Sequence, residues 1–331
     1  MNNKEILLSV CIPTYDGGDY LIENLNVLIP QLEKTEYGVE LIISDNGTTE
    51  KNLSKLQNYF SKQSFPIYFI STAENIGGRA NFVKAVEPAH GKYVLLLGDD
   101  DILLPNLLEI ICPLLASEKY SLIHYNFITA NESLQRPSLQ CKIYEGCTRE
   151  MTATEFLSTS YYDPTFMSSI VFLKECWDNG LPLVRDEYYG YEWFAAICHG
   201  IIRKPNPCLF YYFPLCIQRN PVKTWAKDTP IFKYIGQGFL FRDLDKVAPG
   251  LFESKINFLR TSYFNKFLES VTADPKYFLK YEPLFCEMLD AEELKKLKRA
   301  LHSPFYSQLH AYYVAKAKAK KIQTGLKRLF H

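Results

Sequence analysis

Three consecutive aspartates, Asp99, Asp100 and Asp101, follow the apolar stretch 93–97. Carboxylates this close repel one another, and removing them from water raises the cost further. A shared cation relieves that cost, and a hard divalent ion such as Mg²⁺ or Mn²⁺ prefers oxygen ligands. Because such ions commonly also hold substrate phosphates, the run predicts an enzyme that acts on a diphosphate. The alternative is an acidic turn that caps the next helix, since aspartate is favoured at helix starts.

An alternation of strands and helices has to position this run. Apolar runs and helical spacing predict four strands with three helices between them, at 6–12, 19–33, 39–44, 51–60, 67–70, 79–89 and 93–97. This order predicts an α/β fold with a doubly wound, mostly parallel sheet flanked by helices. Ligands bind beyond the carboxyl ends of the strands in such sheets. The polar runs 13–16, 45–47 and 99–101 all fall at such ends, which predicts one site there.

The pattern changes downstream of the aspartates. The spacing predicts a helix over 103–116, a strand over 122–127 and a polar, turn-rich excursion over 130–150. Aromatic side chains are frequent from 152 to 225. Their faces suit sugar C–H surfaces, so a few of them are expected to line an acceptor cleft while the rest form core. Beyond residue 230 the spacing predicts a mostly helical C-terminal extension.

The bulk composition excludes several classes of protein. The 331 residues carry a formal net charge of zero, so no nucleic-acid partner is indicated. The nine cysteines are scattered and include no Cys-x-x-Cys, which predicts neither a disulfide framework nor a zinc site. No signal-peptide pattern is present, and no apolar stretch reaches the roughly 20 residues that span a bilayer. We therefore expect a cytoplasmic protein.

Positive charge gathers at the C-terminal end. After Glu293 there is no acidic residue, while the last 38 residues carry ten lysines and arginines. Ile322, Leu326, Leu329 and Phe330 recur at helical spacing among them. This pattern predicts a basic amphipathic tail that makes peripheral contact with anionic lipid on the inner face of the cytoplasmic membrane. The alternative is a solvated terminal helix whose charges serve solubility.

Four segments together resemble the family 2 glycosyltransferases, which have the GT-A-type fold. They occur in family order, at 9–15, 40–47, 74–81 and 97–101. The Gly-Asp-Asp-Asp form is most similar to the subgroup that includes abequosyltransferase-type enzymes of surface polysaccharide synthesis. No Gly-x-Gly-x-x-Gly follows the first strand and no Walker-type lysine is present, which argues against dinucleotide and P-loop chemistry.

The resemblance implies that a sugar moves from a nucleotide-diphospho-sugar to an acceptor hydroxyl, usually with inversion. Pro13, Thr14 and Tyr15 would form the loop around the base and ribose. Asp45 would accept a hydrogen bond from the base. Asp16 stands where the family often has asparagine, so the role of this additional nucleotide-side carboxylate is open.

The resemblance to the family also implies roles for the three aspartates. Asp99 would lie near the ribose, Asp101 would bind the Mn²⁺ or Mg²⁺ that bridges the phosphates, and Asp100 would share either role. Arg79, after a glycine pair, would lie near the ribose or the diphosphate. The departing nucleoside diphosphate gains negative charge in the transition state, which such a metal stabilises as a Lewis acid.

Inversion also needs a general base for the acceptor hydroxyl, which the family places ahead of a helix on the acceptor side. Glu192 fits, because neighbouring aromatic side chains would raise its proton affinity by desolvation. Asp186 and Glu187 are rivals a few residues earlier. The alternative is that Glu192 only caps its helix. His199 is expected to be packed rather than catalytic.

The resemblance also implies a domain organisation. A catalytic domain at 1–225 would divide into a nucleotide-sugar half, 1–105, and an acceptor half, 106–225. A mostly helical region with the basic tail would follow at 226–331. The acceptor would be a glycan or a lipid-linked glycan. Separately from the resemblance, we hypothesise a homodimer through the C-terminal helices.

The leading function is therefore a metal-dependent, inverting glycosyltransferase of bacterial surface polysaccharide synthesis. The Gln-x-x-Arg-Trp motif of processive members is absent and echoed only by 218–220 and Trp225, which predicts a non-processive enzyme. A nucleotidyltransferase is one alternative, but its glycine-rich phosphate loop with a basic residue is missing, since Asp19 follows Gly17 and Gly18. A non-catalytic carbohydrate-binding or scaffold protein is another, and the intact aspartates count against it.

Overall fold

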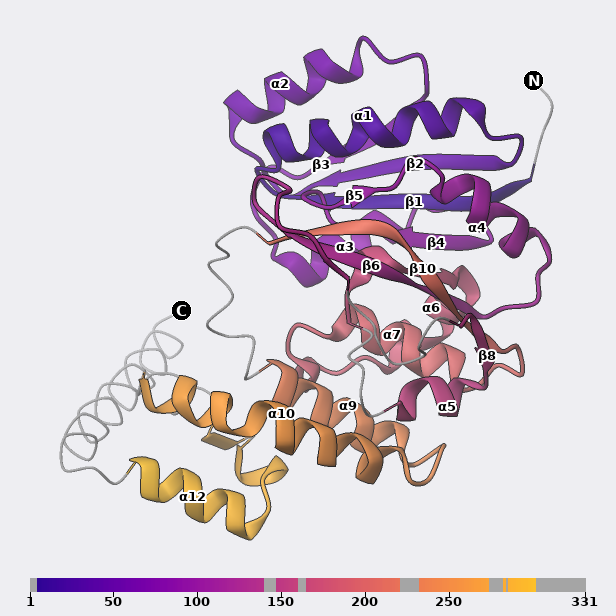
Figure 1. The fold of residues 1–331 in the computed structure, drawn as a ribbon. Helices are drawn as coiled ribbons and strands as arrows, with labels where there is room; N and C mark the ends of the chain where they lie inside the picture. Colours follow the sequence, from indigo (N-terminus) through magenta and orange to yellow (C-terminus); the bar gives the residue numbers. More distant parts are fainter. Residues whose placement is uncertain are drawn as a thin grey trace, which may run out of the picture.

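One mixed sheet with helices on both faces forms the body of the protein in this computed structural model (Figure 1). The structure describes residues 5–139, 147–159, 165–220, 232–273, 282–283 and 285–301. The ten-stranded sheet has the order β3-β2-β1-β4-β9-β6-β10-β5, with β7 beside β6 and β8 beside β10. The predicted α/β class is confirmed.

The first half of the sheet forms as the sequence predicts. Its elements are β1 (Ile6–Thr14), α1 (Gly18–Lys34), β2 (Gly38–Asp45), α2 (Glu50–Phe60), β3 (Ile67–Ser71), α3 (Gly78–Val86) and β4 (Tyr93–Leu96). The four strands are parallel. Thr14 pairs with Asp45, and Asp45 with Ser71, so three strands end level with one another. The register therefore gathers their following loops at one edge.

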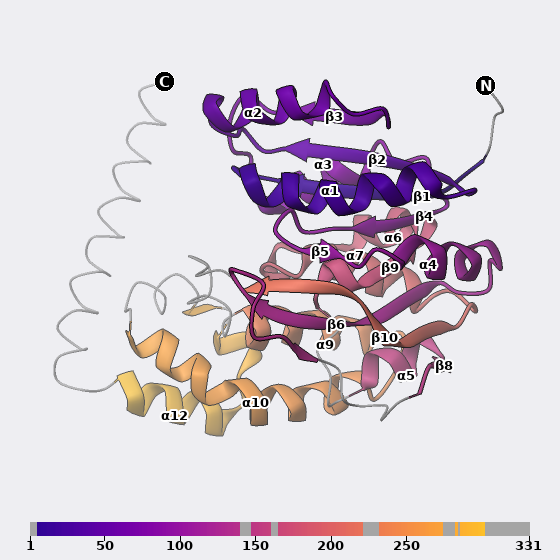
Figure 2. The ribbon, with the colours of Figure 1, turned by 45° about the horizontal axis from the view of Figure 1, so that its top comes forward.

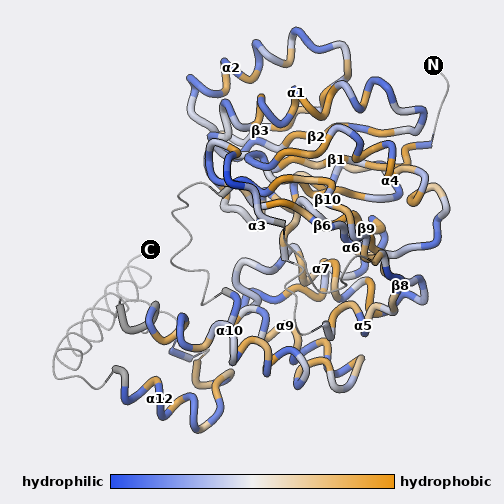
Figure 3. Tube along the Cα trace, viewed as in Figure 1, coloured by the Kyte–Doolittle hydropathy of each residue, from blue (hydrophilic) through white to orange (hydrophobic). Residues whose placement is uncertain are grey.

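Figure 3, coloured by hydropathy, shows that the strands are apolar and that hydrophilic loops lie beyond one end of the strands. β1 and β4 are buried along most of their length because helices cover both faces, which explains their continuous apolar runs. The layers can be followed in Figure 2: α1 and α4 (Leu107–Ala116) lie on one face, and α3, α6 (Lys174–Gly180) and α7 (Glu192–Ile201) on the other.

The helix predicted over 103–116 was wrong at its start. Ile102 and Leu103 instead form β5, which pairs antiparallel with Ile217 and Cys216. Helix α4 begins only at Leu107. The physical reason is that the sheet buries both apolar side chains, while the proline at 105 disfavours a helical conformation in the residue before it.

The second half of the sheet mixes strand directions. Its longer strands are β6 (Leu122–Asn131), β9 (Ile170–Leu173) and β10 (Cys208–Asn220). The short pieces β7 (Ser138–Leu139) and β8 (Arg149–Met151) flank them. β9 runs antiparallel to both β4 and β6, whereas β10 runs parallel to β6. β9 thus joins the two halves into one continuous sheet.

Close packing of α6 on α7 fixes the helix that begins at Glu192. A Cβ atom at Gly180 would lie 1.8 Å from the Ala196 carbonyl oxygen, and one at Gly200 would lie 2.0 Å from that of Cys176. Neither position therefore accepts a larger residue without moving a helix. The two glycines let the backbones touch and so set the position of α7 against the sheet.

The C-terminal part is helical wherever the structure describes it. A π-helical turn (Phe232–Gly236) leads into α9 (Gln237–Leu244), α10 (Leu251–Ala273) and α12 (Ala291–Leu301). Together with α5 (Ala153–Ser158) these helices lie below the sheet in Figure 1. In the described ranges, no helix is both long and apolar enough to cross a membrane. The predicted amphipathic tail, the domain boundary at 225 and Trp225 lie outside the described residues.

Candidate functional site

The loop after β4 is tied to its neighbours at the predicted edge. Thr14, at the end of β1, donates a hydrogen bond from Oγ1 to Asp99 Oδ2 over 2.6 Å. Asn24 of α1 donates to the Gly98 carbonyl oxygen at 3.2 Å, and the Gly98 N–H donates to Ser168 Oγ at 2.9 Å. β1, α1 and the turn before β9 therefore hold the start of the aspartate run, and two of the predicted nucleotide-side residues touch.

Gly17 leaves the room that this contact needs. A Cβ atom there would lie 2.5 Å from both Asp99 Oδ2 and Thr14 Oγ1. The backbone φ of Gly17 is −59°, which any residue adopts, so a substitution tests space alone. We expect Gly17→Ala to cost about 1–3 kcal/mol of folding stability and to weaken nucleotide binding, because overpacking moves the Asp99 carboxylate.

Thermal unfolding and nucleotide titration of Gly17→Ala would check this. Gly78→Ala is the matched control, because no heavy atom lies within 4 Å of a Cβ atom there. Equal nucleotide affinity in the two variants would show that the Thr14–Asp99 contact does not shape the site.

Asp45 and Asp16 fix the loops beside this contact. Buried Asp45 accepts hydrogen bonds from the Ser71 hydroxyl at 2.7 Å and the Thr48 N–H at 3.2 Å. Asp16 Oδ1 accepts from the Thr49 hydroxyl at 2.7 Å and from Asn52 Nδ2 at 3.1 Å. The Thr49 hydrogen bond lowers the pKa of Asp16. Both carboxylates thus hold the start of α2, while their predicted contacts with the nucleotide stay predictions.

The other two residues of the predicted base-and-ribose loop differ in exposure. Pro13 is buried within β1. Tyr15, the first residue beyond the strand, is 53% exposed. An aromatic ring left open at this edge is available for stacking on a flat ligand.

A pair of asparagines, which the sequence reasoning did not single out, positions Arg79. Asn46 accepts a hydrogen bond from the Ile76 N–H at 2.8 Å and donates to Asn75 Oδ1 at 3.1 Å. Asn75 in turn accepts from the Gly77 N–H at 2.9 Å. The loop before α3 is thereby fixed to the end of β2. The signal in the sequence was asparagine beside glycine, since asparagine side chains bond to nearby backbone.

Asp101, the predicted metal ligand, faces the protein interior. It is 3% exposed. The Ser168 hydroxyl donates to its Oδ2, and the Arg219 N–H donates to its Oδ1 at 3.2 Å. Asp99 and Asp100 are only half-buried. The three consecutive carboxylates therefore occupy different surroundings, and Asp101 carries structural hydrogen bonds that its neighbours do not share.

Arg79 meets the acceptor-side candidates. Its guanidinium forms an ion pair with Asp186, whose side chain is 91% exposed. Burial raises the pKa of Glu192, while backbone N–H groups and the Arg79 charge oppose that rise. The sequence reasoning predicted this desolvation. Glu192 is the first residue of α7, and the N–H groups of Gly190 and of Glu192 itself bond to its carboxylate, so a structural role at the helix start stands beside the catalytic one.

The rival Glu187 is committed to a different network. Its carboxylate accepts hydrogen bonds from Arg185, the closer at 3.0 Å, and these lower its pKa. Arg185 also donates to Asp243 at 2.7 Å, and Asp243 accepts from the Tyr188 hydroxyl at 3.0 Å. That hydroxyl lies 3.0 Å from Nε2 of His199, and burial lowers the pKa of His199 to about 4. His199 is packed, as predicted.

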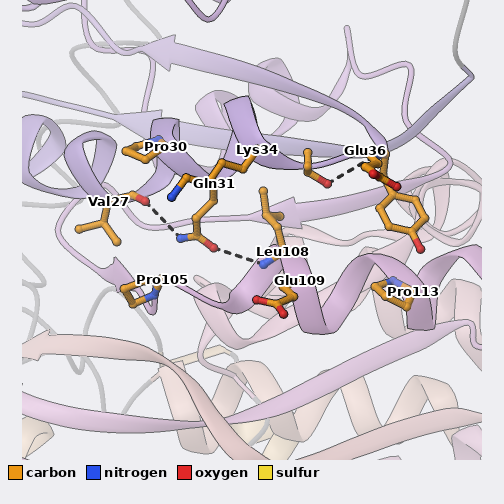
Figure 4. Close-up of a pocket in the computed structure, with 11 residues that line it drawn as sticks. Val27, Pro30, Gln31, Lys34, Glu36, Pro105, Leu108, Glu109 and Pro113 are labelled. Atoms are coloured by element: carbon orange, nitrogen blue, oxygen red, sulfur yellow. Dashed lines mark hydrogen bonds between the residues drawn. The ribbon is translucent and has the colours of Figure 1, made fainter.

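A groove of about 440 Å³ between α1 and α4 lies apart from these residues (Figure 4). Pro30, Pro105 and Pro113 contribute to its walls. Gln31 spans it, donating to the Val27 carbonyl oxygen at 3.2 Å and accepting from the Leu108 N–H at 3.3 Å. The groove sits at the C-terminal part of α1, whereas Gly17 precedes its first turn. None of the predicted site residues lines it.

Comparisons with known proteins assign part of the chain to a family. Residues 9–173 match the family described as glycosyl transferase family 2. Abequosyltransferase RfbV of Salmonella typhimurium is 35% identical over 113 residues, which are 34% of this chain and 34% of that protein. The chain spans about a third to a half of the length of the first curated relatives that it matches.

Solved structures share the fold over most of the chain. Staphylococcus aureus TarS 1–349 in complex with UDP-GlcNAc has a TM-score of 0.57 at 13% identity, over 89% of this chain and 80% of that one. Mannosyltransferase PcManGT from Pyrobaculum calidifontis, in complex with GDP-Man and Mn²⁺, has a TM-score of 0.52 at 12% identity, over 97% and 88%. The expected GT-A-type fold is thereby confirmed. With the matched region covering both the loop after β1 and the aspartate run, this chain belongs to glycosyl transferase family 2.

Proposed function

We propose that this protein is a metal-dependent, inverting, non-processive glycosyltransferase that uses a nucleotide-diphospho-sugar. One observation carries the proposal: Thr14, Asp99 and Asp100 gather at the carboxyl ends of β1 and β4. Half-buried Glu192, whose pKa is raised, lies within electrostatic reach of Arg79. A donor edge and a basic carboxylate are the two parts that such a transfer needs.

The carboxylates fit a hard divalent ion. In the part of the chain that the structure describes, no three His, Cys, Asp or Glu side chains converge into a metal cage. Mg²⁺ typically takes one or two protein carboxylates and completes its shell with substrate phosphates and water, and Mn²⁺ has similar preferences. Asp99 and Asp100 can supply that number, and Asp100 replaces buried Asp101 as our proposed ligand. The bound ion would stabilise the negative charge that develops on the leaving diphosphate.

The residues of this chain would divide the remaining work. Tyr15 and Asp45 would meet the base, and Asp99, held by Thr14, would meet the ribose. When the donor binds, Arg79 would release its ion pair with Asp186 and pair with the diphosphate instead. Glu192 would take the proton of the acceptor hydroxyl. At the same time the hydroxyl oxygen would bond to the anomeric carbon, and the bond between that carbon and the diphosphate would break. Attack opposite to the leaving group inverts that carbon.

The biological setting is part of the proposal. RfbV is named for abequosyl transfer, and TarS is a poly(ribitol-phosphate) β-N-acetylglucosaminyltransferase, so we infer a role in bacterial surface polysaccharide synthesis. The acceptor would be a glycan or lipid-linked glycan. The ten basic residues that follow Glu293 support peripheral contact with the cytoplasmic membrane. Pairing of two copies through the C-terminal helices would complete the assembly.

A thermal-shift screen of UDP, GDP, CDP and dTDP, each with and without Mn²⁺, tests the proposal. We expect one nucleotide to stabilise the protein selectively and only with the metal. A ligand at about 100 times its Kd adds roughly 2.7 kcal/mol of stability. No shift with any nucleotide would contradict the proposal and favour a scaffold role.

A further inference from the structure

Arg219, near the end of β10, bonds to several elements beside the aspartate run. Its Nε donates to the Asp100 carbonyl oxygen at 3.0 Å, and its Nη1 donates to the Glu132 carbonyl oxygen at 2.6 Å. Its Nη2 pairs with Glu23 of α1. The guanidinium also lies 4.6 Å from the centre of the Tyr20 ring. One side chain thus joins the aspartate loop, the turn after β6 and the first helix.

Residue 219 makes two contacts with the aspartate loop, one at Asp100 and one at Asp101. Its side chain bonds to the carbonyl oxygen of Asp100, while its backbone N–H bonds to the carboxylate of Asp101. These two contacts fix the backbone from which the Asp100 side chain projects. The direction of the Asp100 carboxylate therefore depends on the position of residue 219.

The burial of Arg219 is costly for a residue with a packing role alone. Its side chain is only 3% exposed, while its ion-pair partner Glu23 is 51% exposed. Burying a guanidinium is expensive unless its donors are bonded, and an apolar side chain would fill the same space at less cost. The planar fork of arginine instead holds several acceptors in fixed directions, which lysine does not do.

We propose that Arg219 is a positioning residue that holds the loop backbone at Asp100 and so orients the Asp100 carboxylate toward the metal-bound diphosphate of the donor. The inference rests on the proposed function and deepens it at the same site. Groups that orient metal ligands from behind typically change metal affinity by about 10–100-fold when they are replaced. Arg219→Lys keeps the charge and removes the fork, so it isolates the orienting role.

The test measures binding and needs no turnover. The nucleoside diphosphate that binds the wild-type protein is titrated calorimetrically into Arg219→Lys at several Mn²⁺ concentrations. We expect the Mn²⁺ concentration for half-maximal nucleotide binding to rise by about tenfold or more. At saturating Mn²⁺, the nucleotide affinity of Arg219→Lys should match that of the wild type.

Arg260→Lys is the matched control. Arg260 of α10 donates from Nε to Glu293 at 2.8 Å and from Nη2 to Asp290 at 2.8 Å, so the same substitution removes a similar fork in the C-terminal helices. It should lower the thermal midpoint and leave the Mn²⁺ dependence unchanged. Equal Mn²⁺ dependence in the two variants would overturn the inference and leave Arg219 a purely structural residue.

Glu23→Gln keeps the test decisive if Arg219→Lys does not fold. This substitution weakens the ion pair between the Arg219 guanidinium and half-exposed Glu23. It leaves the hydrogen bonds from Arg219 to the Asp100 and Glu132 carbonyl oxygens in place. We expect the Mn²⁺ requirement to rise by about twofold to fivefold, since such pairs contribute up to about 1 kcal/mol. No rise would overturn the inference. A wild-type protein that binds no nucleotide with Mn²⁺ would instead contradict the proposed function itself.

Discussion

Glu192→Gln should lower kcat by about 10²–10⁴-fold, because glutamine keeps the size of the side chain and cannot accept the proton of the acceptor hydroxyl. Nucleotide affinity should change little, since the proposed donor-side contacts involve Thr14, Asp99 and Asp100, which are separate from Glu192. Single-turnover transfer assays, together with nucleotide titration, separate the two effects. A kcat within threefold of the wild type would leave Glu192 with its capping role alone.

The pH profile gives this prediction a second readout. A general base works in its deprotonated form, so kcat/KM should fall as the pH drops through the pKa of Glu192. Because burial raises that pKa above the ordinary value of 4.5, the acid limb should lie above pH 4.5. The limb should be absent from the residual activity of Glu192→Gln.

Two neighbouring carboxylates serve as controls for Glu192. Glu187→Gln should mainly disturb its hydrogen bonds with Arg185. Asp186→Asn removes an exposed partner of Arg79. Neither variant should abolish the acid limb of the pH profile. If the limb disappears in Glu187→Gln instead, the base has to be reassigned to that residue.

Asp100→Asn and Asp101→Asn should fail in different ways. Asp100 is half-buried in the loop after β4. We therefore expect its replacement to reduce the rate of sugar transfer by about 10²–10³-fold, because stabilisation of the leaving diphosphate is lost. Unfolding stability should hardly change. Asp101→Asn disturbs the buried contacts with Ser168 and Arg219, so it should lower stability by about 1–3 kcal/mol.

Chemical denaturation and Mn²⁺-dependent nucleotide binding, measured on both variants, distinguish the two outcomes. Loss of metal-dependent binding in Asp101→Asn at unchanged stability would restore Asp101 as the metal ligand. Loss in neither variant would exclude Asp100 and Asp101 as metal ligands and leave Asp99 as the remaining candidate of the aspartate run.

The first half of the fold could be predicted because each strand there is an apolar run buried by helices on both faces. Residues 6–14 and 93–96 show this in the structure. The mixed second half was harder, because strand direction depends on partners distant in sequence. The error over 103–116 arose in this way, since Ile102 and Leu103 pair with residues more than a hundred positions later.

The candidate site could be predicted in position and only partly in detail. The strand ends fixed the edge at which Thr14 and Asp99 meet. The different surroundings of Asp100 and Asp101 could not be predicted, because nothing in a run of three identical residues indicates which of them is buried. Arg219 was noted only within the faint motif echo at 218–220 and was given no role, for a related reason: its partners come from α1, the aspartate loop and the turn after β6.

The late position of β10 has a consequence for how the chain can be dissected. The family match ends at residue 173, yet the strand that supplies Arg219 spans Cys208–Asn220 and lies between β6 and β5. A fragment cut at the end of the match would keep all four segments between 9 and 101 that resemble the family, lose Glu192, and expose the hydrogen-bonding edge of β6 to aggregation. During synthesis, likewise, the aspartate loop lacks its contacts with Arg219 until residue 219 has left the ribosome. The smallest autonomous catalytic unit therefore extends well past the recognisable motifs.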